Sequence, residues 1–378
     1  MKRIAILVET SLASGRQILG GISRFLKERS DLSVFHLSGN LGEMNPDALV
    51  DWQGDGIIAR VLNKSIAERL TATGLPCVDV LGNVQPQPFP LVKCDDIAIG
   101  RMVAEHFAGS GFRHFGMIGM SAVNWARDRE SAFFETAKEY QGTCHRLDLR
   151  STESEQVNLS TSMDAIRNWL PDLPKPIAIL VASDQFAPLL FEAAHQLGLR
   201  IPEELSVIGV DNDAPYCDLC RPELSSVSPG HEKVGYLAAQ LLEQILSGQP
   251  TGATTMQVSP EMIYLRRSSS SLAVQNQQLA KALEYIRRHA AEGPRIDEIA
   301  AHAGYSRSVL QRRFRSELNR TIGETILNEK LNIAKQLLLT SELSVNRIAE
   351  KAGFNCQEYM GLIFRKHLQQ TPVQFRKS

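Results

Sequence analysis

Short apolar runs alternate with amphipathic stretches over roughly the first 265 residues. Short apolar runs bounded by turn residues predict buried strands, and apolar positions three or four apart predict helices. This alternation is typical of parallel sheets covered on both faces, and so long a region predicts two lobes. The predicted strands are residues 4–8, 32–36, 56–58, 76–80, 113–118, 177–182 and 206–210, closed by 256–258 and 261–265. The predicted helices are 17–28, 66–73, 97–109, 128–140, 163–169, 185–196 and 232–246.

A purely helical pattern follows in the last third of the chain, and part of it occurs twice. In residues 296–318 an apolar stripe at helical spacing stops at Gly304, and Ser306 can cap a second helix. A short helix, a Gly-containing turn and a second helix form the helix-turn-helix plan. The pattern recurs forty-nine residues later around Gly353, which a chance hairpin would not do. The repeated apolar positions predicted to be core are Leu310, Phe314, Ile348 and Phe364.

Charge divides the chain in the same way. The net charge of −1 conceals a basic end, because residues 273–378 carry 17 Lys and Arg against 10 Asp and Glu. The rest of the chain therefore carries 24 against 32. A solvated charged surface could have this composition, but a basic module on an acidic body also indicates a nucleic-acid-binding part.

Other classes of chemistry have little support in the sequence. Cys217 and Cys220 form a lone CxxC without a second ligand pair, so we expect no metal site. No P-loop, GxGxxG or GxSxG occurs, and the adjacent Asp95 and Asp96 do not make a facing acid/base pair. We therefore expect no enzyme and no cofactor. The first apolar run ends at Glu9, too short for a signal peptide, and no run reaches membrane-spanning length, so we expect a cytoplasmic protein.

The repeated C-terminal stretch resembles the DNA-binding domain of the AraC/XylS family of transcription regulators. In that family one long helix joins two helix-turn-helix units, and here it corresponds to residues 323–339. The family pattern has a glycine after each recognition helix, where this chain has Asn319 and Gln369. The resemblance runs to the TPVQFRKS tail and implies an all-α domain with two helix-turn-helix units at residues 274–378.

Several blocks of the first 267 residues resemble the sugar-sensing core of LacI/GalR regulators, which has the periplasmic-binding-protein fold. In sequence order they are CDDIAIGRMVAEHFAGSGFRHFGMIG, ARDRESAFFETAKEY, IAILVASDQFA and LSVIGVDNDAPYCDLCRPELSSV, and LRRS resembles the end of that core. The resemblance implies an α/β ligand-binding domain of two lobes at residues 1–267. The short polar RSSSS run begins a linker at 268–273. LacI/GalR proteins carry DNA binding before this core, whereas here it follows, as in certain bacterial sugar-operon regulators.

Candidate ligand contacts follow from the rule that open parallel sheets bind ligands beyond the carboxyl ends of their strands. Arg129 matches the arginine that LacI/GalR proteins aim into the sugar cleft. Arginine with aspartate offers donors and acceptors to adjacent hydroxyls, and Trp125 can stack on a pyranose. Asp184 could instead cap the helix predicted from residue 185, and Asp95 or Asp96 could cap the next helix. The candidates are Glu9, Thr10, Arg16, Asn83, Trp125, Arg129, Ser183, Asp184, Asp211 and Asn212.

Candidate DNA contacts lie on the two recognition helices. In the first helix Ser308, Gln311 and Arg312 fall on the family's base-reading positions. In the second helix Gly361 and Leu362 cannot hydrogen-bond a base edge, so we expect the first helix to carry most of the readout. Arg365 and Lys366 would hold phosphates. The candidates are Arg307, Ser308, Gln311, Arg312, Arg315, Asn355, Gln357, Glu358, Arg365 and Lys366.

These observations predict a sugar-responsive transcription regulator. By resemblance we expect it to activate a sugar-catabolism operon as a homodimer, with xylose or a related aldose, double-stranded operator DNA and RNA polymerase as partners and no membrane. Another sugar, or a repressor of the same architecture, would leave the same pattern. A sugar-transport binding protein is the rival of another class, and the basic tail argues against it. A DNA-repair sensor with a methyl-accepting cysteine would need a four-cysteine metal cluster, which this sequence lacks.

Overall fold

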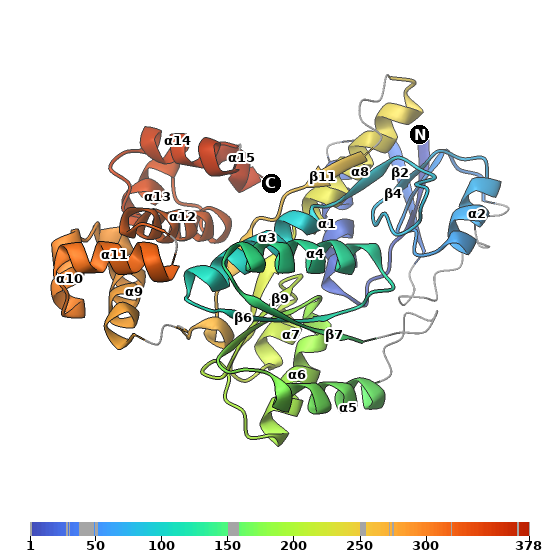
Figure 1. Cartoon of the computed structure of the whole chain (residues 1–378). Helices are drawn as coiled ribbons and strands as arrows, with labels where there is room; N and C mark the ends of the chain where they lie inside the picture. The colour runs from blue at the N-terminus through green and yellow to red at the C-terminus, as the bar shows by residue number, and fades with distance from the viewer. Residues whose placement is uncertain are drawn as a thin grey trace. The chain divides into compact units, whose positions relative to one another are not determined.

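Two six-stranded sheets form the framework of residues 2–270 in the computed structural model of the chain (Figure 1). The structure describes residues 2–27, 29, 31–37, 49, 52–149, 159–249, 255–271, 273, 276–318, 320–368 and 370–377. A first unit contains most of residues 2–270, and a second contains 271–377 with the short segments 105–113 and 140–142. Within the described ranges, no helix has the length and apolarity needed to cross a membrane.

Lobe 1 of the first unit is built on a parallel sheet with the strand order β11-β5-β4-β3-β1-β2. Glycines let helix α1 lie directly against helix α8, because a Cβ on Gly21 would come within 1.8 Å of the Glu232 carbonyl oxygen. The strands are β1 (Lys2–Leu7), β2 (Leu32–Leu37), β3 (Gly56–Ala59), β4 (Cys77–Asp79), β5 (Leu91–Cys94) and β11 (Thr255–Val258). The helices are α1 (Ala13–Lys27), α2 (Lys64–Ala72) and α8 (His231–Leu246).

Lobe 2 has the order β12-β10-β9-β8-β6-β7, with only its edge strand β12 antiparallel. Helices α3 and α4 lie on one face of this sheet and α5, α6 and α7 on the other (Figure 1). The strands are β6 (His114–Gly119), β7 (Thr143–Asp148), β8 (Ile177–Val181), β9 (Leu205–Val210), β10 (Ser225–Ser228) and β12 (Met262–Tyr264). The helices are α3 (Asp96–Gly109), α4 (Asn124–Glu139), α5 (Leu159–Trp169), η2 (Leu170–Asp172), η3 (Asp184–Phe186), α6 (Ala187–Gln196) and α7 (Ala214–Leu219).

The chain passes between the lobes three times. It crosses from β5 into α3, returns from β10 into α8, and crosses again from β11 to β12. Asp95, at the first crossing, accepts a hydrogen bond from the Ala98 backbone nitrogen at 2.9 Å and so caps α3, as one of the two aspartates was expected to do. These crossings bring residues far apart in sequence to the interface of the two lobes.

Three strands were not predicted from the sequence, because their residues are too polar to read as buried strands. Strand β5 contains Lys93, β7 is an edge strand with polar residues, and β10 is the serine-rich segment SSVS. The serines of β10 are buried because they have partners: the Ser226 hydroxyl donates to Asp184 at 2.8 Å, and the Ser225 hydroxyl accepts from Ser269 at 2.7 Å.

The second unit is entirely helical in its main segment, as predicted. Two apolar clusters form its core, one around Leu310 and Phe314 and one around Ile348 and Phe364. The long helix α12 joins them and extends slightly beyond the predicted range of 323–339 at both ends. Asn319 and Gln369 lie outside the described residues. The helices are α9 (Gln277–His289), η5 (Ala290–Glu292), α10 (Ile296–Ala303), α11 (Arg307–Leu318), α12 (Ile322–Thr340), α13 (Val345–Lys351), α14 (Gln357–Leu368) and α15 (Pro372–Lys377).

The segment expected to begin the linker is partly embedded in lobe 2. Helix η4 (Arg267–Ser269) follows β12, and Ser268 and Ser269 are buried. The Ser268 hydroxyl donates to the Val207 carbonyl at 2.7 Å and accepts from the Ser225 backbone nitrogen at 2.8 Å. Helix α9 begins at Gln277, so six residues separate it from Ser270.

Candidate ligand cavity and candidate nucleic-acid interface

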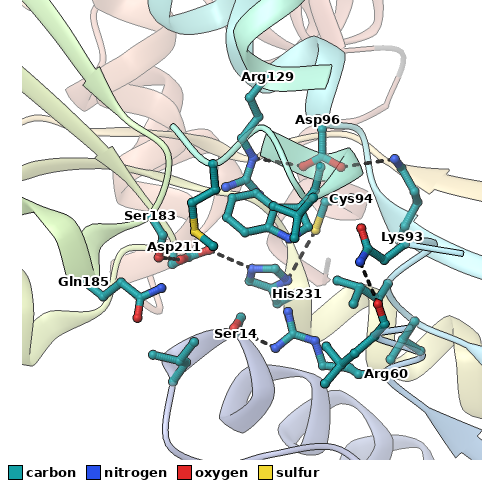
Figure 2. Close-up of a pocket in the computed structure, with 18 residues that line it drawn as sticks. Ser14, Arg60, Lys93, Cys94, Asp96, Arg129, Ser183, Gln185, Asp211 and His231 are labelled. Carbon is teal, nitrogen blue, oxygen red and sulfur yellow. Dashed lines mark hydrogen bonds and ion pairs between the residues drawn. The ribbon is translucent and has the colours of Figure 1, made fainter. Parts of the chain in front are cut away.

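Polar side chains from both lobes converge on a cavity at the carboxyl ends of the two sheets (Figure 2). This is the position at which open parallel sheets bind ligands. Five of the ten predicted ligand residues line it: Asn83, Trp125, Arg129, Ser183 and Asp211. The polar residues of the wall that sequence reasoning missed are Ser14, Arg60, Lys93, Cys94, Asp96, Gln185 and His231.

Asp211 is held in the cavity by an unusual backbone conformation at the end of β9. Its φ is +111° and that of the next residue, Asn212, is +48°, a region that residues other than glycine rarely adopt. The turn presents the buried Asp211 carboxylate to a hydroxyl and an imidazole: Ser183 Oγ donates at 2.7 Å and His231 Nε2 at 3.1 Å. Strain of this kind concentrates at functional positions, which supports a ligand-binding role for this carboxylate.

His231 comes from the second crossing between the lobes and joins Asp211 to Cys94. Its Nδ1 lies 3.3 Å from the Cys94 sulfur while Nε2 bonds Asp211. Burial alone would lower the pKa of His231, but its interactions with Cys94 and Asp211 outweigh burial and raise that pKa to about 10. Burial would likewise raise the pKa of Asp211, and His231 instead lowers it. The contact with the Asp211 carboxylate thus favours the imidazolium form of His231.

This ion pair makes stability depend on pH in a defined direction. A histidine whose folded pKa lies above its unfolded value stabilises fully below about pH 6.5, and the contribution is lost as pH rises through about 10. In the wild-type protein the free energy of unfolding should therefore fall between pH 7 and 10 as His231 loses its proton. His231→Gln lacks this group, so we expect its free energy of unfolding to fall less over the same range, by on the order of a few kcal/mol. Urea melts of the full chain across this range measure the slope, with the exposed His195→Gln as matched control. An unaltered slope in the His231 variant would contradict the assignment.

Arg129 is fixed from several sides at the other wall of the cavity. Its Nε donates to Asp96 at 2.9 Å, one Nη donates to the Ala182 carbonyl at 2.6 Å, and the guanidinium lies over the Trp125 ring at 4.7 Å. Lys93 lies 3.3 Å from the same Asp96 carboxylate, across the lobe boundary. Arg129 is thus oriented by partners within the protein, and Trp125 packs against its guanidinium.

Glu9 lies behind Arg60 rather than on the cavity wall. Arg60 pairs with the buried Glu9 and lies 3.2 Å from Ser14 Oγ, and within the described structure its buried Nε has no hydrogen-bond partner. Arg60 was not predicted because it follows the short strand β3 without a neighbouring polar cluster. Because Arg60 lines the cavity and carries several N–H donors, it is a candidate ligand contact.

The other four predicted ligand residues make contacts away from the cavity wall. Arg16 is half-exposed, donates to the Thr10 carbonyl at 2.9 Å and pairs with Asp213 at 3.3 Å. Asp184 accepts from the Asp213 backbone nitrogen at 2.8 Å and from Ser226, so it braces the β9 turn instead of capping a helix. Asn212 accepts from Arg266 at 2.9 Å. Asp184 and Asn212 lie just after strands β8 and β9, but their side chains bond other parts of the protein, and Arg16 lies within helix α1.

The candidate nucleic-acid interface consists of two matched helical hairpins. Gly304, with φ +72°, lies between α10 and α11, and Gly353, with φ +77°, lies between α13 and α14. The left-handed backbone conformation at this position favours glycine and allows the sharp turn between the helices. Leu310 and Phe314 turn inward on α11, and Met360 and Phe364 do so on α14. The ten predicted DNA contacts are all exposed: Arg307, Ser308, Gln311, Arg312, Arg315, Asn355, Gln357, Glu358, Arg365 and Lys366.

Comparison with known proteins agrees with this arrangement. The chain matches the family models of an XylR N-terminal domain over residues 3–96, a periplasmic-binding-protein-like domain over 104–269 and a helix-turn-helix domain over 299–378. It is 30% identical to the xylose operon regulatory protein of Escherichia coli K12 across 99% of this chain and 96% of that protein. The chain belongs to the family of xylose operon regulatory proteins. The corresponding protein of Haemophilus influenzae is 28% identical over 99% of this chain and 98% of its own length.

Solved structures give the same result for this xylose-regulator family. A structure described as the xylose-binding transcription activator xylR superposes with a TM-score of 0.63 and 29% identity, covering 100% of this chain and 98% of that one. A LacI-type regulator from Alkaliphilus metalliredigens, solved with D-xylulofuranose, covers 72% of this chain at 21% identity and a TM-score of 0.59, and shows the fold alone. The predicted fold class, the resemblance to both families and the role of sugar-responsive transcription regulator are confirmed.

Proposed function

We propose that this regulator binds xylose, or a closely related aldose, in the cavity between its two lobes and activates a xylose-catabolism operon. The observation that carries the proposal is the group of Asp211, Arg129 and Trp125 from lobe 2, which shares one cavity with Arg60 and Asn83 from lobe 1. A carboxylate and a guanidinium bond adjacent hydroxyls, and an aromatic ring packs on the apolar face of a sugar. The names of the relatives that match over nearly their whole length support xylose as the first choice.

The proposed contacts combine predicted and newly found residues. Asn83, Trp125, Arg129, Ser183 and Asp211 bind hydroxyls or the ring, and Arg60 and His231 join them. The other five predicted residues act indirectly. Glu9 orients Arg60, and Arg16 pairs with Asp213, whose backbone nitrogen is bound by Asp184. The Thr10 carbonyl holds Arg16, and Asn212 ties the β9 turn to Arg266. The cavity binds its sugar without converting it.

Ligand binding is coupled to DNA through closure of the lobes. Both lobes supply cavity residues, so a bound sugar favours the closed arrangement over the open one. The predicted boundaries were 1–267, 268–273 and 274–378; because Ser268 and Ser269 are buried in lobe 2, we place the end of the ligand-binding domain at Ser270, six residues before α9. A cytoplasmic homodimer would set two such DNA-binding domains on adjacent half-sites beside RNA polymerase. Repression, or another sugar, would use the same arrangement. A thermal-shift screen of pentoses and hexoses tests the ligand.

On the DNA side, replacing Arg312 should cost sequence-specific affinity. Arginine reads guanine with two hydrogen bonds, so Arg312→Ala should weaken operator binding by about 1–3 kcal/mol and relax specificity at one base pair. Lys366→Ala should instead weaken binding to all sequences and reduce the salt dependence of affinity by about one phosphate contact. Fluorescence anisotropy with the full chain measures both. Lys281→Ala removes an exposed charge from α9 and is the control. Wild-type DNA binding that does not respond to salt would contradict the nucleic-acid role.

A further inference from the structure

The two recognition helices match residue for residue but differ in what they expose. Helices α11 and α14 start fifty residues apart, at Arg307 and Gln357, and bury equivalent side chains: Leu310 corresponds to Met360 and Phe314 to Phe364. The exposed positions therefore correspond with the same offset. Arg312 of the first helix is matched by Leu362 of the second, and Gln311 by Gly361.

Leu362 is exposed although the core beneath it is well formed. Its side chain is 62% exposed, the highest value for a large apolar side chain in the described part of the second unit. Its neighbours Ile363 and Phe364 are buried, so helix α14 already has a complete apolar stripe facing inward. A Cβ on Gly361 would contact nothing within 4 Å, so nothing inside the protein requires a glycine there. Together these positions form a bare apolar surface on the face equivalent to the base-reading face of α11.

We infer that Leu362 reads thymine, by packing against the C5-methyl groups that thymines present in the major groove. This inference rests on the proposed DNA-binding function. It means that the two hairpins recognise bases in different ways. The hairpin of α11 uses hydrogen bonds from Arg312 and Gln311, and the hairpin of α14 uses apolar contact. In the major groove thymine is the base that carries a methyl group, so an apolar side chain distinguishes it from cytosine. Gly361 beside Leu362 leaves room for the bases to approach the helix backbone.

Charge around Leu362 favours DNA over a protein partner as the occupant. Arg365 and Lys366 follow one turn after Leu362 and are exposed, whereas the acidic Glu358 lies one turn before it, so the positive charge lies on the C-terminal side of the leucine. Exposed cations beside an apolar residue suit a methyl group flanked by phosphates. Contact with a polymerase subunit would use the same exposed leucine but would not depend on thymine methyl groups, so the two occupants can be separated by experiment.

The test removes methyl groups from DNA and the leucine from the protein. Duplexes bound by the full chain are first selected from a random-sequence library, and each thymine of the selected sequence is then replaced by deoxyuridine. We expect one or two replacements in one half of the site to weaken wild-type binding by about fourfold each, the effect of one buried methyl group. Leu362→Ala should bind the thymine and deoxyuridine duplexes equally at these positions, and Leu362→Met should retain the difference. Val373→Ala, which shortens another exposed apolar side chain, should behave as wild type.

Three outcomes would overturn the inference. Wild-type protein could bind thymine and deoxyuridine duplexes equally, or the difference could persist in Leu362→Ala. Leu362→Ala could also keep full operator affinity but lose transcription in a reconstituted system, which would assign the leucine to polymerase. A library that yields no selected sequence would contradict the DNA-binding function itself and overturn both proposals, so the two failures are distinguishable.

Discussion

Replacing Asp211 with alanine should abolish stabilisation of the protein by its sugar while leaving DNA binding intact. At a hundredfold excess over its dissociation constant, a ligand of the native state stabilises by about 2.7 kcal/mol. Asp211 would accept hydroxyl hydrogen bonds and also holds His231 and Ser183 in place. Removing one carboxylate therefore removes the direct contact and disturbs two further groups, so we expect the sugar-dependent shift to vanish.

The comparison must separate loss of binding from loss of folding. Asp211→Ala leaves the buried His231 cation without its carboxylate, which lowers the stability of the free protein. For this reason the measured quantity is the change in melting temperature on adding sugar, rather than the melting temperature itself. Operator binding by the same preparation shows that the chain has folded. Asp172→Asn, at an exposed position of lobe 2, is the matched control and should keep the full shift. A full shift in Asp211→Ala would remove this residue from the site.

Sugar and operator should each tighten the binding of the other by the same factor. Lobe closure alters the part of the protein to which the DNA-binding domain is joined, and only six residues separate Ser270 from helix α9. Thermodynamic reciprocity then requires that operator tighten sugar binding as much as sugar tightens operator binding. A typical coupling of about 1–3 kcal/mol corresponds to about 5–150-fold in affinity.

Titrating sugar with and without operator measures this coupling directly. Equal sugar affinities would mean that sugar acts on polymerase contact instead, with both binding sites unaffected. A long flexible Gly/Ser insertion after Ser271 provides the second measurement. It should keep both binding activities and lose most of the coupling, because a flexible connection transmits little of the lobe movement. A coupling that survives the insertion unchanged would contradict transmission through the short connection.

The sequence was most informative about ligand residues that lie just after the end of a buried strand. Ser183 and Asp211 come directly after buried strands, and the rule for parallel sheets locates them at the cavity. Neither Lys93, Cys94 nor His231 has such a signal, because they lie where the chain crosses between lobes and their proximity depends on the three-dimensional path of the chain. Position after a strand was also insufficient in itself. Asp184 follows β8 yet turns into lobe 2, since the β10 serines and the Asp213 backbone supply its partners.

The helical unit was predicted more fully because its signal is local. A repeated apolar stripe with glycine at the turn determines both hairpins, and each helix forms its hydrogen bonds within itself. The polar strand β10 was missed for the opposite reason. Its serines are buried only because Asp184 and the distant Ser268 and Ser269 satisfy them, and no local pattern shows such partners.

The burial of Ser268 and Ser269 determines where this protein can be cut and rejoined. A chimera that joins this sensor, cut after residue 267, to the DNA-binding domain of another regulator would lose two hydroxyls that satisfy β10 and the Val207 carbonyl. We expect the ligand-binding domain to lose stability, while the attached DNA-binding domain is unaffected. A junction after Ser270 keeps the edge of lobe 2 whole, and it transfers the six-residue connection unaltered with the DNA-binding domain. Exchange of sensors within the family should therefore succeed at the later junction and fail at the earlier one.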